Sequence, residues 1–299
     1  MRGNVFHRQI VLALIANVLA MTANAQAQVS VNDDYGNRVT LRQPARRVVS
    51  LAPHLTELLY AAGAGERMVA AIEHSDYPEQ ASKLPRIGSE AGINLESLLR
   101  VKPDLVAAWP NAGSRRQIER IAALGIPVYR SEPRELDDIA RTLRTLGELA
   151  GTRAAADAAA QAFRQRAAEL QRVHSGKPAV RVFYQVWDRP LMTVNGAHLI
   201  SKVIRLCGGE NVFAGLPVIA PPIDREAVLR ANPEVIVASG LDSRRPAWLD
   251  DWSVFPGLAA VARGNLHAIA PELMQRHTPR ILDGAERLCA ILDQARARR

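Results

Sequence analysis

The chain has 299 residues, 48% of them hydrophobic and 23% charged, and a formal net charge of +8 at pH 7. This length suffices for two domains of ordinary size, and the apolar content suffices for a sizeable buried core. The basic residues are dispersed apart from a short cluster at the carboxyl terminus. We therefore expect no nucleic-acid partner, and we interpret the charge as solubility with some steering of anions.

Residues 1–25 have the pattern of a signal peptide for export. Arg2 and Arg8 give a basic start, residues 10–20 form an apolar run, and small residues ending at Ala25 form a cleavage site. A second possible cleavage site ends at Ala27. The apolar run is too short to span a bilayer as a mature helix. The sequence therefore predicts a soluble, exported mature protein.

Residues 26–151 alternate strands with helices after a predicted hairpin at about 29–41, which has turn residues at its tip. Strands are predicted at 48–52, 68–72, 105–108 and 128–129, and helices at 56–62, 117–124 and 136–149, with one more short helix that ends at Pro103. Such alternation predicts a parallel sheet. This part of the chain is therefore expected to form an α/β lobe.

Residues 152–174 are predicted to link two lobes. The stretch 154–173 contains no Gly or Pro and is rich in alanine, the residue with the highest helix propensity. A helix of this length extends about 30 Å. Because a helix is stiffer than a Gly/Ser hinge, we expect limited movement of the lobes.

Residues 175–299 are predicted to form a second α/β lobe. The expected elements are a strand at 180–186, a helix at 199–207, a Trp-bearing segment at 247–252, a strand at 266–270 and a closing helix at about 279–296. The predicted fold class is thus α/β, with two lobes of mainly parallel sheets flanked by helices and one long rigid helix between them.

One segment occurs twice, at an offset of 130 residues. Residues 93–108 (INLESLLRVKPDLVAA) and 223–238 (IDREAVLRANPEVIVA) are identical at six of sixteen positions. Each copy predicts a short helix, a proline turn and a strand buried on both faces. The repetition indicates that the two lobes have the same build.

Each copy of the repeat also begins with a polar cap and a glutamate. Asn94 and Asp224 are suited to cap the helix, and Glu96 and Glu226 fall in its first turn, where the helix dipole favours an anion. The dipole explains a carboxylate at this step. It does not require the same residue in both lobes, so a partner with two-fold symmetry is the alternative explanation.

The chain contains two cysteines, Cys207 and Cys289. In an exported protein, two cysteines are most simply joined as one disulfide, and the alternative is two buried free thiols. No metal-ligand spacing such as CxxC is present, and we predict no metal site.

Known catalytic motifs are absent from the sequence. It has no GxSxG elbow, no phosphate loop, no HExxH and no GxGxxG after a strand. We therefore predict that the protein is not an enzyme and needs no cofactor. A metal-dependent hydrolase that uses histidines and Glu90, and a sensor module that partners a receptor, are the alternatives from other classes.

Aromatic and polar residues gather where the predicted strands end, which is where open α/β sheets bind ligands. The predicted ligand-binding residues are His54, His74, Tyr77, Glu90, Trp109, Trp187, Asn195 and Arg276. Structural roles are the alternative for several of them. The tryptophans are also suited to packing between the lobes, His54 to a cap or turn, and Arg276 to a surface salt bridge.

Several motifs give the chain a resemblance to a known family. They are SLAPHLTELLYAAGAG (50–65), HSDYP (74–78), VWDRPLMTVNG (186–196) and LCGGENVF (206–213), together with the repeat. With them the chain resembles the periplasmic cobalamin-binding proteins. These belong to the helix-linked class of ABC-importer binding proteins, which also includes siderophore and haem binders. The resemblance covers nearly the whole mature chain.

The resemblance implies a periplasmic monomer that holds a corrinoid in a cleft between two lobes. It implies ligand contacts at Trp109, Trp187 and Arg276, and a permease dimer of an inner-membrane ABC importer as partner. It also implies that Glu96 and Glu226 dock onto arginines of that permease, one on each subunit.

The sequence departs from the family pattern at three positions. Glu90 and Ala220 stand where tryptophan is expected, and His74 stands at a tyrosine-like position. Fewer aromatics leave open a haem or ferric-chelate ligand, with His54, His74 or His277 as metal ligands.

Overall fold

The computed structural model describes residues 28–89, 92–111, 113–240 and 244–299. The predicted signal peptide, its cleavage near Ala25 or Ala27, and the predicted ligand contact at Glu90 lie outside the described residues. Within the described part of the chain, no helix combines the length and apolar character that crossing a membrane requires.

A hairpin and a four-stranded parallel sheet form the part of the chain before residue 152, here called the first lobe. The hairpin pairs β1 with β2, and the sheet has the order β4-β3-β7-β8. The strands are β1 (Val29–Asn32), β2 (Arg38–Leu41), β3 (Val48–Ser50), β4 (Met68–Ala71), β5 (Gly88–Ser89), β6 (Gly92–Ile93), β7 (Leu105–Ala108) and β8 (Val128–Arg130). The helices are α2 (Pro53–Ala61), η1 (Gly65–Arg67), α3 (Glu79–Ser82), α4 (Leu95–Arg100), α5 (Arg115–Ala123) and α6 (Leu136–Ala150).

A second parallel sheet, of order β10-β9-β11-β12, forms the part after residue 174, here called the second lobe. Its strands are β9 (Val180–Gln185), β10 (Gly209–Asn211), β11 (Val235–Ala238) and β12 (Leu266–Ala268). Its helices are α8 (Leu199–Leu206), α9 (Arg225–Ala231), η2 (Ala247–Val254), α10 (Ala259–Ala262), α11 (Pro271–Met274) and α12 (Ile281–Ala297).

The two parallel sheets have the same strand order. When the four strands of each sheet are numbered along the chain, their order across the sheet is second, first, third, fourth. The repeated segment supplies α4 and β7 in one lobe and α9 and β11 in the other. The Asn94 carboxamide accepts a hydrogen bond from Ser97 N at 2.9 Å, and the Asp224 carboxylate accepts one from Ala227 N at 2.6 Å. The predicted α/β class and the predicted capping are confirmed.

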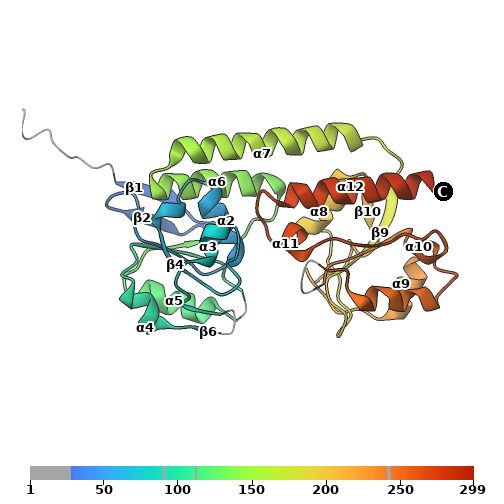
Figure 1. Cartoon of the computed structure of the whole chain (residues 1–299), viewed down its shortest axis with the longest axis horizontal. Coiled ribbons are helices and arrows are strands. Elements are labelled where there is room, and N and C mark those ends of the chain that lie inside the picture. Colours follow the sequence, from blue (N-terminus) through green and yellow to red (C-terminus); the bar gives the residue numbers. More distant parts are fainter. Residues whose placement is uncertain (1–27, 90–91, 112, 241–243) are drawn as a thin grey trace, which may run out of the picture.

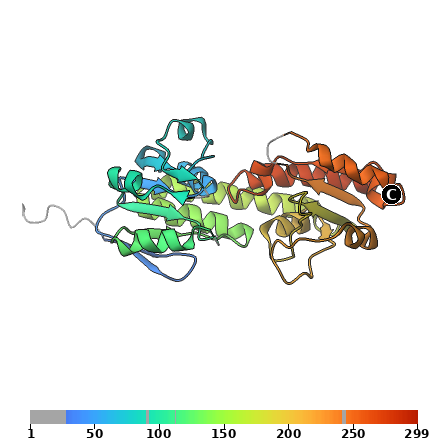
Figure 2. The same ribbon diagram turned by 90° about the horizontal axis from the view of Figure 1, so that it is seen from below.

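The helix α7 (Arg153–His174) runs across both lobes (Figure 1). It contacts α6 and α2 of the first lobe, and α8 and α12 of the second. Gly151, with φ of 70°, separates α6 from α7 in the left-handed conformation that glycine adopts readily. The lobes lie side by side along the long axis in both views (Figures 1 and 2).

One continuous buried cluster joins the two lobes beneath α7. It includes Leu55 and Leu143 of the first lobe, Phe163 of α7, and Val182 and Leu288 of the second lobe. Two smaller clusters lie on the other faces of the sheets, one in each lobe. Because α7 is part of the shared core, the linking helix holds the lobes by packing as well as by its own stiffness.

Among the element boundaries that differ from the sequence prediction, two decide where His54 lies. The strand expected to reach residue 52 ends at Ser50, and the helix expected from Thr56 begins at Pro53. Proline is favoured in the first turn of a helix because its missing N–H is not needed there. As a result His54 belongs to the helix rather than to a loop.

A disulfide joins Cys207 to Cys289 across 82 residues, as predicted. Cys207 follows α8, and Cys289 lies in the middle of α12. Both residues are buried among apolar neighbours. The disulfide therefore ties the closing helix to the helix that follows the first strand of the second lobe.

Candidate ligand-binding site

In the first lobe, Trp109 and His54 lie at the carboxyl ends of β7 and β3. Trp109 is 38% exposed, while His54 is buried and meets the tryptophan ring edge-on, with 5.6 Å between ring centroids. A hollow of about 20 Å³ beside them is lined by Pro53, Trp109, Asn111 and neighbouring residues. This volume is about that of one water, so this hollow is too small to enclose a ligand, and the ring of Trp109 is presented as a wall.

In the second lobe, Trp187 follows β9 and is 42% exposed. Its indole N–H donates to the Arg189 carbonyl at 3.1 Å, which fixes the ring orientation. The ring lines a hollow of about 320 Å³ together with Asp188, Arg189, Gly240 and Trp248. Trp248 was not among the predicted site residues, although the segment 247–252 was noted for its tryptophans.

A hollow of about 450 Å³ lies elsewhere, at the outer end of the first lobe. It is lined by Arg46, Arg67, Gly151 and Arg153, among others. Among the described residues, its lining includes no carboxyl end of a strand and none of the predicted ligand-binding residues. Because ligands of open α/β sheets bind at the carboxyl ends of the strands, we place the site at the tryptophans despite the larger volume here.

Four rings form a row across the junction of the lobes, and His54 is the most deeply buried of them. After Trp109 and His54, the row continues with His277 at 6.3 Å from His54, and then His198 at 5.7 Å from His277. Burial lowers the pKa of His54 and of His198 to about 3, and that of His277 to about 4. The positive charge of Arg276 adds to the lowering at His54. All three imidazoles are therefore neutral at pH 7.

The row of histidines does not form a metal centre. Among the described residues, no group of three or more His, Cys, Asp or Glu side chains is arranged to hold a metal ion. The Nε2 atom of His54 is buried without a hydrogen-bond partner. The His198 Nδ1 atom accepts a hydrogen bond from Ile200 N at 3.1 Å and caps α8.

Arg276 joins the lobes through acidic partners of the first lobe. Its guanidinium pairs with Glu57 at 2.8 Å and with Asp76 at 2.6 Å, and it donates to the His74 carbonyl at 3.1 Å. Burial alone would raise the pKa of Asp76, but the hydrogen bond and charge of Arg276 hold that pKa below its usual value. The side chains of His74 and Tyr77 are exposed near this pair.

Asn195 makes structural contacts. Its amide donates to the Leu216 carbonyl at 2.9 Å and accepts from Ala197 N at 2.9 Å. The residue is buried. These bonds hold the 214–222 loop, where Val218 and Ile219 are exposed. A ligand contact by Asn195 stays a prediction.

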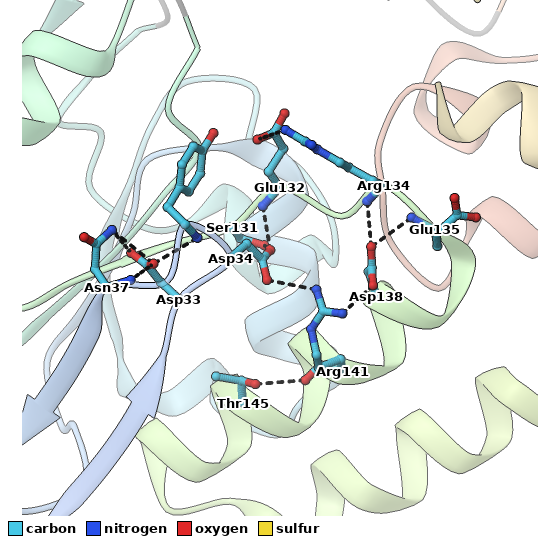
Figure 3. A network of polar contacts seen from close by, with 11 residues as sticks. Asp33, Asp34, Asn37, Ser131, Glu132, Arg134, Glu135, Asp138, Arg141 and Thr145 are labelled. Atoms are coloured by element: carbon cyan, nitrogen blue, oxygen red, sulfur yellow. Dashed lines mark hydrogen bonds and ion pairs between the residues drawn. The ribbon is translucent and has the colours of Figure 1, made fainter. Parts of the chain in front are cut away.

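A polar network ties the tip of the β1–β2 hairpin to the segment 131–135 (Figure 3). The Asp34 carboxylate accepts from Glu132 N at 2.6 Å and pairs with Arg141 at 3.0 Å. The segment then reaches the second lobe, where Glu135 pairs with Lys202 of α8 at 2.5 Å. The hairpin thereby supports one of the contacts between the lobes.

Glu96 and Glu226 occupy equivalent exposed positions in the first turns of α4 and α9. Glu96 is paired only with the exposed Arg100 of its own helix, at 2.7 Å. In Figure 1, α4 and α9 both lie on the side of the molecule opposite to α7. The two helices that carry the matched glutamates thus lie on one side of the molecule, one in each lobe.

Comparison with known proteins identifies the chain's relatives. The chain is 41% identical over 249 residues to the vitamin B12-binding protein of Yersinia pestis strain Pestoides F, covering 83% of this chain and 86% of that protein. It is also similar to the crystal structure of the periplasmic vitamin B12 binding protein BtuF of Vibrio cholerae. That match has a TM-score of 0.78 and 36% identity, and covers 85% of this chain and 98% of that one.

A more distant match supports the fold alone. The periplasmic heme-binding protein RhuT of Roseiflexus sp. RS-1 has a TM-score of 0.73 and 24% identity, and covers 84% of this chain and 99% of that one. The family model described as periplasmic binding protein matches residues 48–272, which include both sheets and α7. The chain therefore belongs to the periplasmic binding protein family.

Proposed function

We propose that this protein captures cobalamin or a related corrinoid between its two lobes and delivers it to an inner-membrane ABC importer. The observation that carries the proposal is the pair of half-exposed tryptophans, Trp109 and Trp187, at strand ends of different lobes. Indole rings bury the apolar faces of a macrocycle well, while polar neighbours meet its amides. Relatives named as vitamin B12-binding proteins support this choice of ligand.

The proposal includes a division of the chain into a signal peptide (1–25), a first lobe (26–151), a linking helix (152–174) and a second lobe (175–299). It also includes cleavage near Ala25 or Ala27, release into the periplasm, a monomeric state and the absence of catalysis. The signal-like sequence of residues 1–25 and membership of a periplasmic family support the location.

A haem or a ferric chelate is the second candidate ligand. The observation that favours it is the unpartnered Nε2 atom of His54, because imidazole is a common iron ligand. That atom is enclosed by protein, however, so ligation requires movement of the surrounding residues. The corrinoid, which needs only the exposed rings, therefore remains our first choice.

Visible absorption tests the ligand directly. We expect the protein incubated with cyanocobalamin or cobinamide, and then desalted, to retain about one corrinoid per chain. Haemin treated in the same way is expected to be lost. Retention of haem without corrinoid would contradict the corrinoid proposal and support haem as the ligand.

We propose in addition that Glu96 and Glu226 dock onto arginines of a permease dimer. Two lobes with the same sheet order match a two-fold partner, and α7 fixes the distance between the two carboxylates. Carboxylate–arginine pairs are favoured by their bidentate, charge-assisted geometry.

A further inference from the structure

One acidic side chain is buried at the junction of the lobes. Glu57 lies in α2 between apolar residues of the shared core, and its side chain is only 2% exposed. A buried carboxylate is costly unless it is paired and hydrogen-bonded. Both partners of Glu57 come from the second lobe, from the short segment between α11 and α12.

These partners are Arg276 and Arg280. Arg276 donates to the Glu57 Oε1 atom at 2.8 Å. Arg280 donates to both carboxylate oxygens, at 2.9 Å to Oε2 and 2.6 Å to Oε1. The Arg280 contact is bidentate, the geometry that best fixes the direction of a guanidinium. The relative placement of α2 and the α11–α12 segment is therefore set at this carboxylate.

Two further residues of the first lobe complete an interlobe cluster of Glu57, Asp76, Tyr77, Arg276 and Arg280. Asp76 balances the second positive charge by pairing with Arg276 at 2.6 Å. The Arg280 guanidinium lies over the Tyr77 ring at 3.9 Å, a cation–π contact. The cluster thus contains two cations and two anions, and every contact named here crosses between the lobes.

We propose that Glu57 is the positioning residue that fixes the angle between the two lobes before any ligand binds. Through Arg276 and Arg280 it holds the second lobe, and so sets the spacing between the strand ends that carry Trp109 and Trp187. The inference goes beyond the proposed function, because it concerns the geometry of the empty protein and holds for a corrinoid or any other ligand.

Other ion pairs that cross the junction are more exposed, which makes Glu57 the decisive one. Lys202 and Glu135 are 19% and 59% exposed at their side chains. Arg166 of α7 pairs with Asp283 and Glu286 of α12, all between 39% and 50% exposed. Exposed pairs are weakened by water and salt, whereas loss of a partner from a buried pair leaves an uncompensated charge.

Distance measurements between spin labels test this role. We would place labels at Glu119→Cys on α5 and Arg230→Cys on α9, both exposed and neither a member of the cluster. The native cysteines are joined in a disulfide, so only the added thiols react. In ligand-free protein, we expect one narrow distance distribution for the parent. In Glu57→Gln we expect a distribution at least twice as broad or with a second maximum.

Asp76→Asn is the matched control, since it removes an exposed carboxylate from the same cluster and leaves the buried pair intact. We expect its distribution to stay close to that of the parent. Should Glu57→Gln not fold, the triple change Glu57→Gln, Arg276→Gln, Arg280→Gln removes the three charges together and is expected to broaden the distribution equally. A parental distribution in the folded Glu57 variant, or equal broadening in Asp76→Asn, overturns the proposal.

Discussion

The two lobes share one framework and differ where their strands end. Both sheets have the same strand order, and the repeated segment occupies the same place in each. At the strand ends, however, the first lobe leaves a hollow of about 20 Å³ beside Trp109, and the second leaves about 320 Å³ between Trp187 and Trp248. The framework is therefore duplicated, while the surfaces at the strand ends are not.

This difference assigns separate tasks to the shared and the divergent parts. Under the proposed function, a symmetric partner would be recognised through what the lobes have in common, and an asymmetric ligand through what they do not. We assign the matched Glu96 and Glu226 to the first task. We assign the two tryptophans and their unequal hollows to the second. Four predictions test the comparison, from the largest expected effect to the smallest.

Loss of both glutamates removes the shared feature. We predict that Glu96→Ala and Glu226→Ala together abolish ligand uptake through the importer and leave ligand affinity unchanged. Each single change is expected to weaken docking about tenfold or more, since a charge-assisted hydrogen bond contributes about 1.5–3 kcal/mol. Uptake of labelled cobalamin and pull-down of the permease measure the two effects.

The control is Glu169→Ala, an exposed glutamate of α7 on the opposite side of the molecule. It is expected to dock and transport normally. If the double variant still drives uptake at the parental rate, the two glutamates serve only their helix termini, where an anion contributes about 0.3–1 kcal/mol.

The disulfide stabilises the second lobe alone, because the described residues of the first lobe contain no disulfide. We predict that Cys207→Ala with Cys289→Ala lowers the free energy of unfolding by up to about 4–5 kcal/mol, the chain-entropy value for a loop of 82 residues. Urea unfolding measures the loss. A thiol titration of denatured, unreduced parent should find no free cysteine, and two free thiols in exported material would contradict the disulfide.

Acid is predicted to destabilise the protein through the histidine row that joins the lobes. His54 has its pKa lowered to about 3, against about 6.5 in an unfolded chain. The unfolded state then binds more protons between these values, so stability is complete above pH 6.5 and falls as the pH drops. At pH 5 the loss is about 2 kcal/mol for such a histidine. His198, with the same lowered pKa, is expected to lose a similar amount.

Thermal unfolding at pH 7 and pH 5 measures this loss in the parent and in two variants. His54→Leu is expected to remove the contribution of His54 to the acid-induced loss of stability. Its other effects on stability are the same at both pH values and therefore cancel in the comparison. His198→Asn removes the contribution of His198 and keeps a capping side chain on α8. An acid-induced loss of equal size in all three proteins would exclude His54 and His198 as its source.

Much of the fold was predictable from the sequence because it rests on local patterns. The repeat 93–108/223–238 gave the matching helices and strands, and the alanine-rich stretch gave α7. The row of rings was not predictable, since His54, His198 and His277 lie far apart in the chain and meet only when the lobes pack together. Glu57 left one faint signal, an acid placed among Leu55, Leu58 and Leu59 of an apolar helix.

The tryptophans provide the finest test of the difference between the lobes. We predict that Trp109→Ala weakens cyanocobalamin binding at least tenfold, which equals about 1.4 kcal/mol. The reason is that Trp109 is the only aromatic residue among the described residues that line the hollow of the first lobe. Trp187→Ala is expected to cost less, because Trp248 lines the same hollow and would still offer an aromatic ring there. Titration followed by visible absorption or tryptophan fluorescence compares the two dissociation constants.

Trp187→Phe serves as a control that keeps an aromatic face. A larger loss at Trp187 than at Trp109 would show that the second lobe provides most of the stacking and that the wall of the first lobe contributes little.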